Sequence, residues 1–113
     1  MPLQGEYEPS SEKWVRDQVQ EYESSFGTRG TTLRGVPVVV ITSLGASSGK
    51  LRKNPVMRVE TDGVYAAVAS KGGAPQHPAW YRNLVEHPLM ELQDGPDKHD
   101  FTAREVFGDE RSL

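Results

Sequence analysis

Apolar side chains near the start of the sequence recur with the spacing of a helix. Five of them share one face of a 3.6-residue period over residues 11–26. These are Trp14, Val15, Val19, Tyr22 and Phe26. The pattern predicts a helix that packs this face on the core, preceded by a flexible polar tail at residues 1–10. Ser10 or Ser11 can cap its start, and Gly27 can supply the left-handed residue at its end.

The same helix could instead lie on a membrane surface, because amphipathic helices also bind lipid. Its polar face, however, mixes acidic with basic side chains. These are Glu12, Glu21 and Glu23 against Lys13 and Arg16. We therefore favour packing on the core.

The middle of the sequence changes to strand-like patterns after a short polar link at residues 28–35. Residues 36–42 are mainly β-branched and show no polar alternation, which predicts a strand buried on both faces. Residues 51–60 alternate between two faces and predict the next strand. Glycine and serine at residues 43–50 indicate a turn between them, so the two strands form a hairpin.

Later turn signals divide the rest of the chain. The pair Asp62-Gly63 accepts the positive φ angles of a tight hairpin turn, so a strand at residues 64–70 returns antiparallel. Pro78 suits the first position of a helix. Pro88 disfavours a helical conformation at the residue before it, so the helix ends before His87. The remaining predicted elements are the helix at residues 78–86, strands at 89–93 and 99–107, and an unfinished helical turn at 109–111.

Five predicted strands joined by short turns, with a helix inserted between the third and the fourth, indicate an antiparallel sheet. We predict a mainly β, α+β fold in which the sheet curls into a small barrel with the helices outside. A length of 113 residues allows a single domain with its own core. Because the last helical signal is incomplete at Leu113, we expect this domain to lack C-terminal elements.

Composition argues against several classes of function. The sequence has no cysteine, which rules out disulfides, thiolate metal sites and a cysteine nucleophile. Its formal charge of −3 argues against a nucleic-acid surface. The three histidines lie on different predicted elements, and we find neither a Ser-His-Asp set nor a carboxylate pair, so we expect no metal centre. No apolar run approaches the roughly 20 residues that span a bilayer.

We therefore expect a soluble cytoplasmic protein, with peripheral contact to the inner face of the cell membrane left open. The sequence does not choose an oligomeric state.

Two segments carry candidate chemistry. A strand, the loop Ser70-Lys71-Gly72-Gly73 and a helix start follow one another, which is a layout that binds anions. Four basic residues also fall within nine positions without an acidic one, at Lys50, Arg52, Lys53 and Arg58. Such features are often only a solvated connector and a solubilising strand edge. Because the predicted hairpin makes the two segments neighbours, Arg52 and Lys71 can meet on one phosphate.

Several motifs in fixed order carry a resemblance to a known family. They are Thr42-Ser43-Leu44-Gly45, Ser48-Gly49-Lys50-Leu51-Arg52, Asn54-Pro55, Ala69-Ser70-Lys71-Gly72-Gly73, His77-Pro78-Ala79-Trp80-Tyr81 and Asn83-Leu84-Val85-Glu86-His87-Pro88. Over about residues 33–107 the chain resembles the deazaflavin-dependent nitroreductases of actinobacteria. These proteins are split β-barrels, similar to the FMN-binding class, that bind coenzyme F420. The resemblance implies an oxidoreductase that transfers a hydride from reduced coenzyme F420 to a quinone or nitroaromatic acceptor.

The resemblance also implies roles for individual residues. Arg52 and Lys71 would bind the coenzyme phosphate and acidic tail, with Ser70 as the hydrogen-bond donor that stabilises charge on the acceptor. The further residues implied at the coenzyme are Ser47, Ser48, Lys50, Asn54, Pro55, Ala69, Gly72, Gly73, Trp80 and Asn83. Relatives usually carry Arg-Lys where this chain has Ala46 and Ser47, so phosphate contacts are lost or moved to Lys50 or Lys53 and affinity is expected to fall.

Two other functions remain open from the sequence. One is an FMN-binding reductase of the same barrel class, which would also need a basic phosphate site. The other is a non-catalytic protein that binds or carries the deazaflavin. Trp80 likewise has two interpretations, since an aromatic residue in the first turn of an amphipathic helix often belongs to the core.

Overall fold

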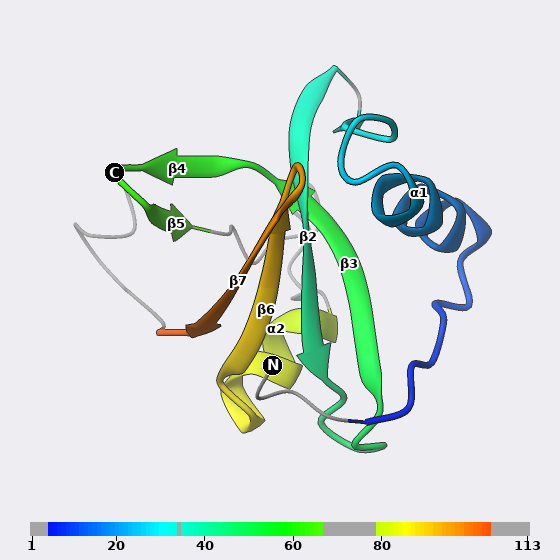
Figure 1. Cartoon of the computed structure of the whole chain (residues 1–113). Helices are drawn as coiled ribbons and strands as arrows, with labels where there is room; N and C mark the ends of the chain where they lie inside the picture. Colours follow the sequence, from blue (N-terminus) through cyan, green and yellow to red (C-terminus); the bar gives the residue numbers. More distant parts are fainter. Residues whose placement is uncertain (1–4, 34, 67–78, 105–113) are drawn as a thin grey trace.

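The computed structural model describes residues 5–33, 35–66 and 79–104, and they form a mixed α+β fold (Figure 1). The elements in order are α1 (Lys13–Ser24), β1 (Thr32–Leu33), β2 (Val36–Leu44), β3 (Leu51–Met57), β4 (Val59–Thr61), β5 (Val64–Ala66), α2 (Ala79–Glu86), β6 (Leu89–Asp94) and β7 (Asp97–Thr102). All pairs between these strands are antiparallel. The predicted class, an antiparallel sheet with an N-terminal helix and a helix between strands, is confirmed.

Parts of several predictions lie outside the described residues. These are the strand at residues 67–70, the loop at 71–76, Pro78 at the start of the second helix, and the chain after residue 104.

Strand β2 is the centre of the larger sheet. It pairs with β3 along residues 38–44 and with β6 at residues 40–42, while β1 pairs with its first two residues and β7 extends the sheet from β6. Residues 38–43 of β2 are all buried. The prediction of a strand covered on both faces is confirmed, because a helix packs against each side.

The two faces of β2 belong to different cores, since side chains alternate along a strand. One core joins Val38 and Val40 to the face of α1. Its buried residues are Val15, Val19, Tyr22, Val38 and Val40. The other core joins Val39 and Ile41 to α2 and β6. Its buried residues are Val39, Ile41, Trp80, Met90 and Leu92. Helices α1 and α2 therefore lie on opposite faces of the sheet.

Helix α1 is shorter than the predicted 11–26, and two of its predicted apolar residues are not buried. Trp14 is 49% exposed and Phe26 is 69% exposed. The helix ends at Ser24, so Phe26 has a left-handed φ of 55° and leaves the apolar face. Gly27 follows with a φ of 76° and closes the end as predicted, donating its N–H to the Tyr22 carbonyl at 2.8 Å.

The start of α1 also differs from the prediction. Glu12 occupies the N-cap position and makes no side-chain cap hydrogen bond. Ser10 lies two residues earlier, where its Oγ accepts the N–H of Glu12 at 3.1 Å. Neither predicted serine is the capping residue.

The predicted strand at residues 51–60 is divided, which is a correction. It breaks at Arg58, whose N–H donates to the Pro37 carbonyl at 2.8 Å, and the chain then turns into a separate two-stranded sheet of β4 and β5. Figure 1 shows this hairpin projecting from the end of β3 on the side away from α1. Its turn is the predicted one, with positive φ at Asp62 (53°) and Gly63 (81°).

Two smaller predictions also change. The link at residues 28–35 contains the short strand β1. The last predicted strand, residues 99–107, is β7 and begins two residues earlier, directly after the turn at Gly95 and Pro96, and ends at Thr102. The described strands form one five-stranded and one two-stranded sheet, and these two sheets do not by themselves close into a barrel.

The segment predicted as a free tail lies beside β3. Residues 5–9, here called the N-terminal strap, run along its start, where Tyr7 forms a parallel bridge to Leu51. The N–H of Leu51 donates to the Glu6 carbonyl at 2.8 Å, and the N–H of Glu8 donates to the Leu51 carbonyl at 2.9 Å. The strap thus covers the start of β3 with backbone hydrogen bonds.

Candidate functional site

The turn between β2 and β3 is held by a buried side chain from α2. Asn83 is 8% exposed, and its Oδ1 accepts the N–H of Ala46 at 2.9 Å. Its Nδ2 donates to Ser43 Oγ at 3.3 Å. Asn83 was predicted at the coenzyme ring, and in this structure both ends of its amide are engaged by the β2–β3 hairpin. It positions the turn that carries the predicted residues Ser47 and Ser48.

The turn itself is closed by backbone hydrogen bonds. The N–H of Gly45 donates to the Lys50 carbonyl at 2.8 Å, and the N–H of Gly49 donates to the Gly45 carbonyl at 3.0 Å. Ser48 Oγ accepts the N–H of Lys50 at 3.2 Å. A Cβ on Gly45 would lie 2.5 Å from this hydroxyl, so a larger residue there would displace the Ser48 side chain. Ser47 and Ser48 are exposed on a turn of defined shape.

The basic side chains after this turn have acidic partners from distant segments. Arg52 Nη1 lies 3.1 Å from Glu8 Oε1 in the N-terminal strap. Lys53 forms an ion pair with Glu23 of α1, and its Nζ lies 5.2 Å from the centre of the Tyr7 ring. Arg52 and Lys53 point to opposite faces of β3, which is why they meet different segments.

Arg58 and Lys50 complete the basic group. Arg58 Nε donates to both carboxylate oxygens of Asp94 at 3.0 Å, and its Nη2 lies 2.9 Å from Oδ2. Within residues 5–33, 35–66 and 79–104, Lys50 has no ion-pair partner. The cluster that the sequence shows as a positive island is therefore largely neutralised in the folded chain.

A second polar cluster, which sequence analysis missed, joins the two sheets. Tyr65 of β5 donates its hydroxyl to Asp94 Oδ2 at 2.6 Å, beside the Arg58 contact. The hydrogen bonds from Arg58, more than those from Tyr65, hold the pKa of Asp94 below its usual range. The hydrogen bond to Asp94 raises the pKa of Tyr65. The Tyr65 ring also lies 5.7 Å from that of Phe101 in β7. No local spacing links these residues, since they are far apart in sequence.

Two predicted residues, Arg52 and Asn54, share one face of the hairpin. Arg52 lies opposite Ser43 and Asn54 lies opposite Ile41 in the β2–β3 register, and residues opposite each other project to the same side. This is the side covered by α2, so Arg52, Asn54 and the Asn83–Ser43 contact adjoin one another. Pro55 lies opposite Val40 and belongs to the other face.

Trp80 lies in the core of the α2 side. It is 9% exposed and packs with Ile41 and Leu92. The predicted residues Ala69, Ser70, Lys71, Gly72 and Gly73 lie outside the described residues.

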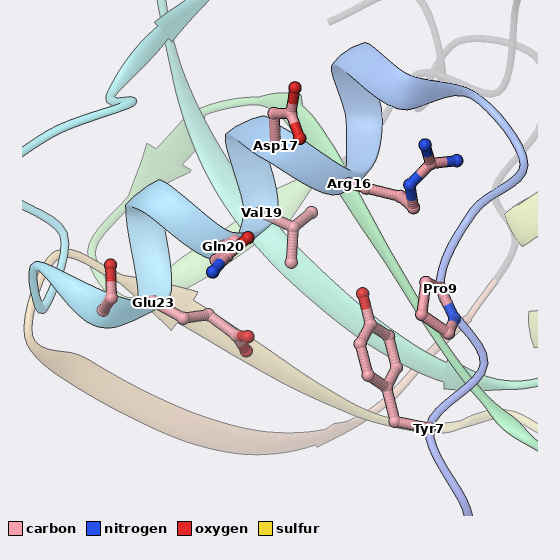
Figure 2. A pocket seen from close by; sticks show the side chains of 8 residues that line it. Tyr7, Pro9, Arg16, Asp17, Val19, Gln20 and Glu23 are labelled. Atoms are coloured by element: carbon pink, nitrogen blue, oxygen red, sulfur yellow. The ribbon is translucent and has the colours of Figure 1, made fainter.

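A cavity of about 380 Å³ lies on the opposite side of β3, between the strap and α1 (Figure 2). Figure 2 shows the Tyr7 ring and Pro9 on one side of it and the α1 side chains on the other. Its lining residues are Tyr7, Pro9, Arg16, Asp17, Val19, Gln20, Glu23 and Ser24. None of these is a predicted coenzyme residue.

The described residues suit the anionic part of a phosphorylated coenzyme. The guanidinium of Arg52 already holds a carboxylate, that of Glu8, which shows that its donors can reach an anion's oxygens. Lys50 and the hydroxyls of Ser47 and Ser48 add donors from the adjacent turn.

In the same described part of the chain, no group of three acidic or histidine residues is placed to hold a metal ion. Neither described helix is long and apolar enough to cross a bilayer.

The fold is α+β, and these hydrogen-bond donors gather at one end of its central hairpin. Comparison with known proteins identifies the family. The family model described as F420H(2)-dependent quinone reductase matches residues 14–113. The F420H(2)-dependent quinone reductase Rv1261c of Mycobacterium tuberculosis is 33% identical over 86 residues, which cover 75% of this chain and 58% of that protein. A putative F420H(2)-dependent quinone reductase of the same species, Rv3178, is 31% identical over 77 residues, covering 68% of this chain and 65% of the relative.

Solved structures agree with these relatives. A structure of the F420-H2 dependent reductase FDR-A aligns with a TM-score of 0.62 and 53% identity, over 67% of this chain and 68% of that one. A structure described as a domain-swapped dimer aligns with a TM-score of 0.64 and 46% identity, over 91% and 78% of the two chains. This chain belongs to the F420H2-dependent quinone reductase family, and the predicted resemblance is confirmed. It spans 58% of the length of the first of these relatives.

Proposed function

We propose that this protein is an oxidoreductase that transfers a hydride from reduced coenzyme F420 to a quinone. The observation that carries the proposal is the family match across residues 14–113. It is supported by an arginine, Arg52, that can hold an anion on the face of the hairpin shared with Asn54 and Ser43. Nitroaromatic compounds are proposed as further acceptors.

We assign the anionic part of the coenzyme to the cationic end of this site. Arg52 and Lys71 would bind the phosphate and the acidic tail, with Lys50, Ser47 and Ser48 contributing from the turn. Charge-assisted hydrogen bonds of this kind are the strong ones in proteins. Asn83 would act by fixing the turn through its hydrogen bond to Ala46.

We assign the ring to the adjoining apolar surface. Asn54, Ala69, Trp80, Gly72 and Gly73 would frame it, whereas Pro55, which was also predicted beside the ring, projects to the other face of the sheet. When bound, the reduced deazaflavin supplies the hydride. The protein must hold an acceptor against the ring, exclude water and stabilise negative charge on the acceptor oxygen. Ser70 is the proposed donor to that oxygen.

The finer architecture and location form part of the same proposal. We propose that the two described sheets belong to a split β-barrel. We propose a cytoplasmic location, with contact to the inner face of the cell membrane as a route to lipid-soluble quinones. The exposed aromatic residues Trp14 and Phe26 at the two ends of α1 support such a contact.

The test is equilibrium titration of the full chain with coenzyme F420 and, separately, with FMN, followed by turnover with one quinone and one nitroaromatic acceptor. We expect micromolar or tighter binding of F420, much weaker binding of FMN, and reduction of the quinone. Equal affinity for the two coenzymes would favour an FMN reductase. Binding without turnover would instead indicate a non-catalytic deazaflavin carrier.

Variants that remove a positive charge test where the coenzyme's anionic groups bind. Arg52→Ala and Lys71→Ala should each weaken F420 binding by roughly 1.5–3 kcal/mol and flatten its salt dependence. The matched control is Lys98→Ala, which removes an exposed cation of β7 on a different hairpin. If Lys98→Ala weakens binding as much as the other two, the effect is that of net charge, and the anion site is not at Arg52.

A further inference from the structure

The Arg52 guanidinium already contacts an anion supplied by the chain itself. Glu8 of the N-terminal strap approaches it at 3.1 Å across 44 positions of sequence. The pair is not sealed from solvent, since the Arg52 side chain is 32% exposed and that of Glu8 is 42% exposed. A ligand anion can therefore reach the same guanidinium, but it must compete with the Glu8 carboxylate.

The strap is attached in a way that allows local detachment. Its backbone is tied to β3 through one residue, Leu51, by the two hydrogen bonds to Glu6 and Glu8. Behind it lies the cavity of about 380 Å³ rather than close packing (Figure 2). A segment with few buried apolar contacts and few backbone hydrogen bonds opens at low free-energy cost.

Side chains alternate along the strap, so neighbouring residues of the strap contact different segments. Tyr7 faces α1, where it lines the cavity and lies near Lys53. Glu8, the next residue, faces the other side and meets Arg52. By this alternation Glu6 lies on the same side of the strap as Glu8, but it forms no ion pair with Arg52 in the described residues, and its backbone carbonyl accepts the Leu51 N–H.

We propose that Glu8 is an affinity-determining residue of the coenzyme site, acting as an internal carboxylate that occupies Arg52 until an anionic group of the coenzyme displaces it. The inference rests on the proposed function for the identity of the ligand. The shared chemistry is an anionic oxygen, either of the phosphate or of a carboxylate in the acidic tail. With an internal competitor, the apparent association constant of the coenzyme is its intrinsic value multiplied by the fraction of molecules in which Arg52 is free.

The first experiment measures F420 binding at equilibrium in five proteins, which are wild type, Glu8→Gln, Glu6→Gln, Arg52→Ala and the double variant of Arg52→Ala with Glu8→Gln. Glu8→Gln keeps the shape of the side chain but removes its charge, so F420 should bind about two- to fivefold more tightly, the range that a half-exposed ion pair supports. Glu6→Gln is the matched control, because it removes the same charge from the same strap without touching Arg52, and it should leave the affinity unchanged. In an Arg52→Ala background, Glu8→Gln should have no effect.

Two analogues separate the sources of the anion. A deazaflavin nucleoside without phosphate or tail should bind wild type and Glu8→Gln equally. A coenzyme with the phosphate but no tail shows which group displaces Glu8. If the phosphate displaces Glu8, this analogue should still bind more tightly to Glu8→Gln than to wild type. If the tail displaces Glu8, the analogue should bind both proteins equally. Unchanged or weaker F420 binding in Glu8→Gln would overturn the inference and leave Glu8 as a structural ion-pair partner.

A second experiment does not depend on the coenzyme. Inorganic phosphate is titrated into isotope-labelled protein, and the side-chain N–H resonance of Arg52 and the exchange rate of the Leu51 amide are followed. Glu8→Gln should shift the midpoint for Arg52 to lower phosphate, and phosphate should speed exchange at Leu51 in wild type as the strap lifts. If F420 fails to bind any variant, the proposed function fails. If phosphate acts identically on wild type and Glu8→Gln, the role of Glu8 fails.

Discussion

The side chain of Asn83 accepts the backbone N–H of Ala46 at 2.9 Å, across 37 positions of sequence. One amide thereby connects the middle of α2 to the turn between β2 and β3. The turn carries Ser47, Ser48 and Lys50, which are proposed to meet the anionic part of the coenzyme. The placement of α2 and the shape of that turn are therefore coupled.

Replacing Asn83 tests this coupling. Asn83→Ala leaves the Ala46 N–H and the buried Ser43 hydroxyl without their partner, so the free energy of unfolding should fall by about 1–3 kcal/mol. Urea denaturation measures the change. F420 binding should also weaken because the turn loses its support. Arg82→Ala, at the neighbouring exposed position, is the control and should change stability by less than about 0.5 kcal/mol. Equal effects of the two substitutions would contradict a specific role for the amide.

The hydroxyl of Tyr22 joins α1 to the turn after β6. It accepts the N–H of Gly95 at 2.7 Å and donates to the Gln93 carbonyl at 3.3 Å. Burial raises the pKa of this phenol. Tyr22→Phe keeps the ring and removes both bonds, so it should destabilise the protein by about 1–2 kcal/mol in thermal or urea unfolding. Tyr7→Phe is the control, because that half-exposed ring makes no hydrogen bond in the described residues. A loss as large in Tyr7→Phe would count against the Tyr22 contacts.

Gly27 lies against the backbone of Gly95, where no side chain fits. A Cβ at Gly27 would come within 2.2 Å of Gly95 Cα, and the residue has a φ of 76°. Gly27→Ala therefore combines backbone strain with overlap, and we expect a loss of about 3–5 kcal/mol. Gly35→Ala isolates the strain, since Gly35 has a φ of 77° with open space around its Cβ. It should cost about 1 kcal/mol. Similar melting temperatures for the two variants would show that the contact with Gly95 is absent.

The Arg58–Asp94 pair predicts a dependence of stability on acid. Hydrogen bonds from Arg58 lower the pKa of Asp94 in the folded state, relative to an ordinary value of 3.8. The ionised carboxylate therefore stabilises the fold above that ordinary value, and this contribution is lost as the pH falls through the lowered folded pKa. Because Arg58 is 39% exposed, solvent screens the pair, and we expect the loss of stability to be small.

The measurement is urea unfolding of wild type and Asp94→Asn at several pH values from 7 to below 3.8. Wild type should be the more stable at neutral pH, and the difference should shrink in acid. Asp100→Asn controls for net charge, because that exposed carboxylate makes no ion pair in the part of the chain that the structure describes. A difference between wild type and Asp94→Asn that stays constant in acid would contradict the assigned cause.

Much of the local structure could be predicted because its determinants lie within a few residues. The β-branched run of β2 indicated burial on both faces, since any strand that lacks polar alternation must be covered on each side. The pair Asp62-Gly63 indicated its turn through the positive φ angles it tolerates. The spacing of Val15, Val19 and Tyr22 indicated the face of α1 that is buried. The order of motifs identified the family.

The ends of helices and strands were harder to predict than their interiors. Phe26 continues the apolar period of α1 but lies beyond the last helical residue, because the chain turns left-handed there and the helix periodicity no longer applies. Arg58 continues the alternation of β3, yet its N–H bonds to Pro37 and the strand breaks. The first pattern fails because the helix ends before the apolar period does, and the second because a contact from another segment overrides it.

The charge partners were decided by the tertiary structure alone. In sequence, Arg52, Lys53 and Arg58 form a positive cluster that appears ready for a ligand. In the fold, Glu8, Glu23 and Asp94 reach them from 44, 30 and 36 positions away. Periodicity and turn chemistry encode which way a side chain points on its own element, whereas an ion pair depends on where two elements come to rest against each other. That placement is set by packing across the whole sheet, so the sequence shows the cations of the candidate site and only the fold shows which anions already contact them.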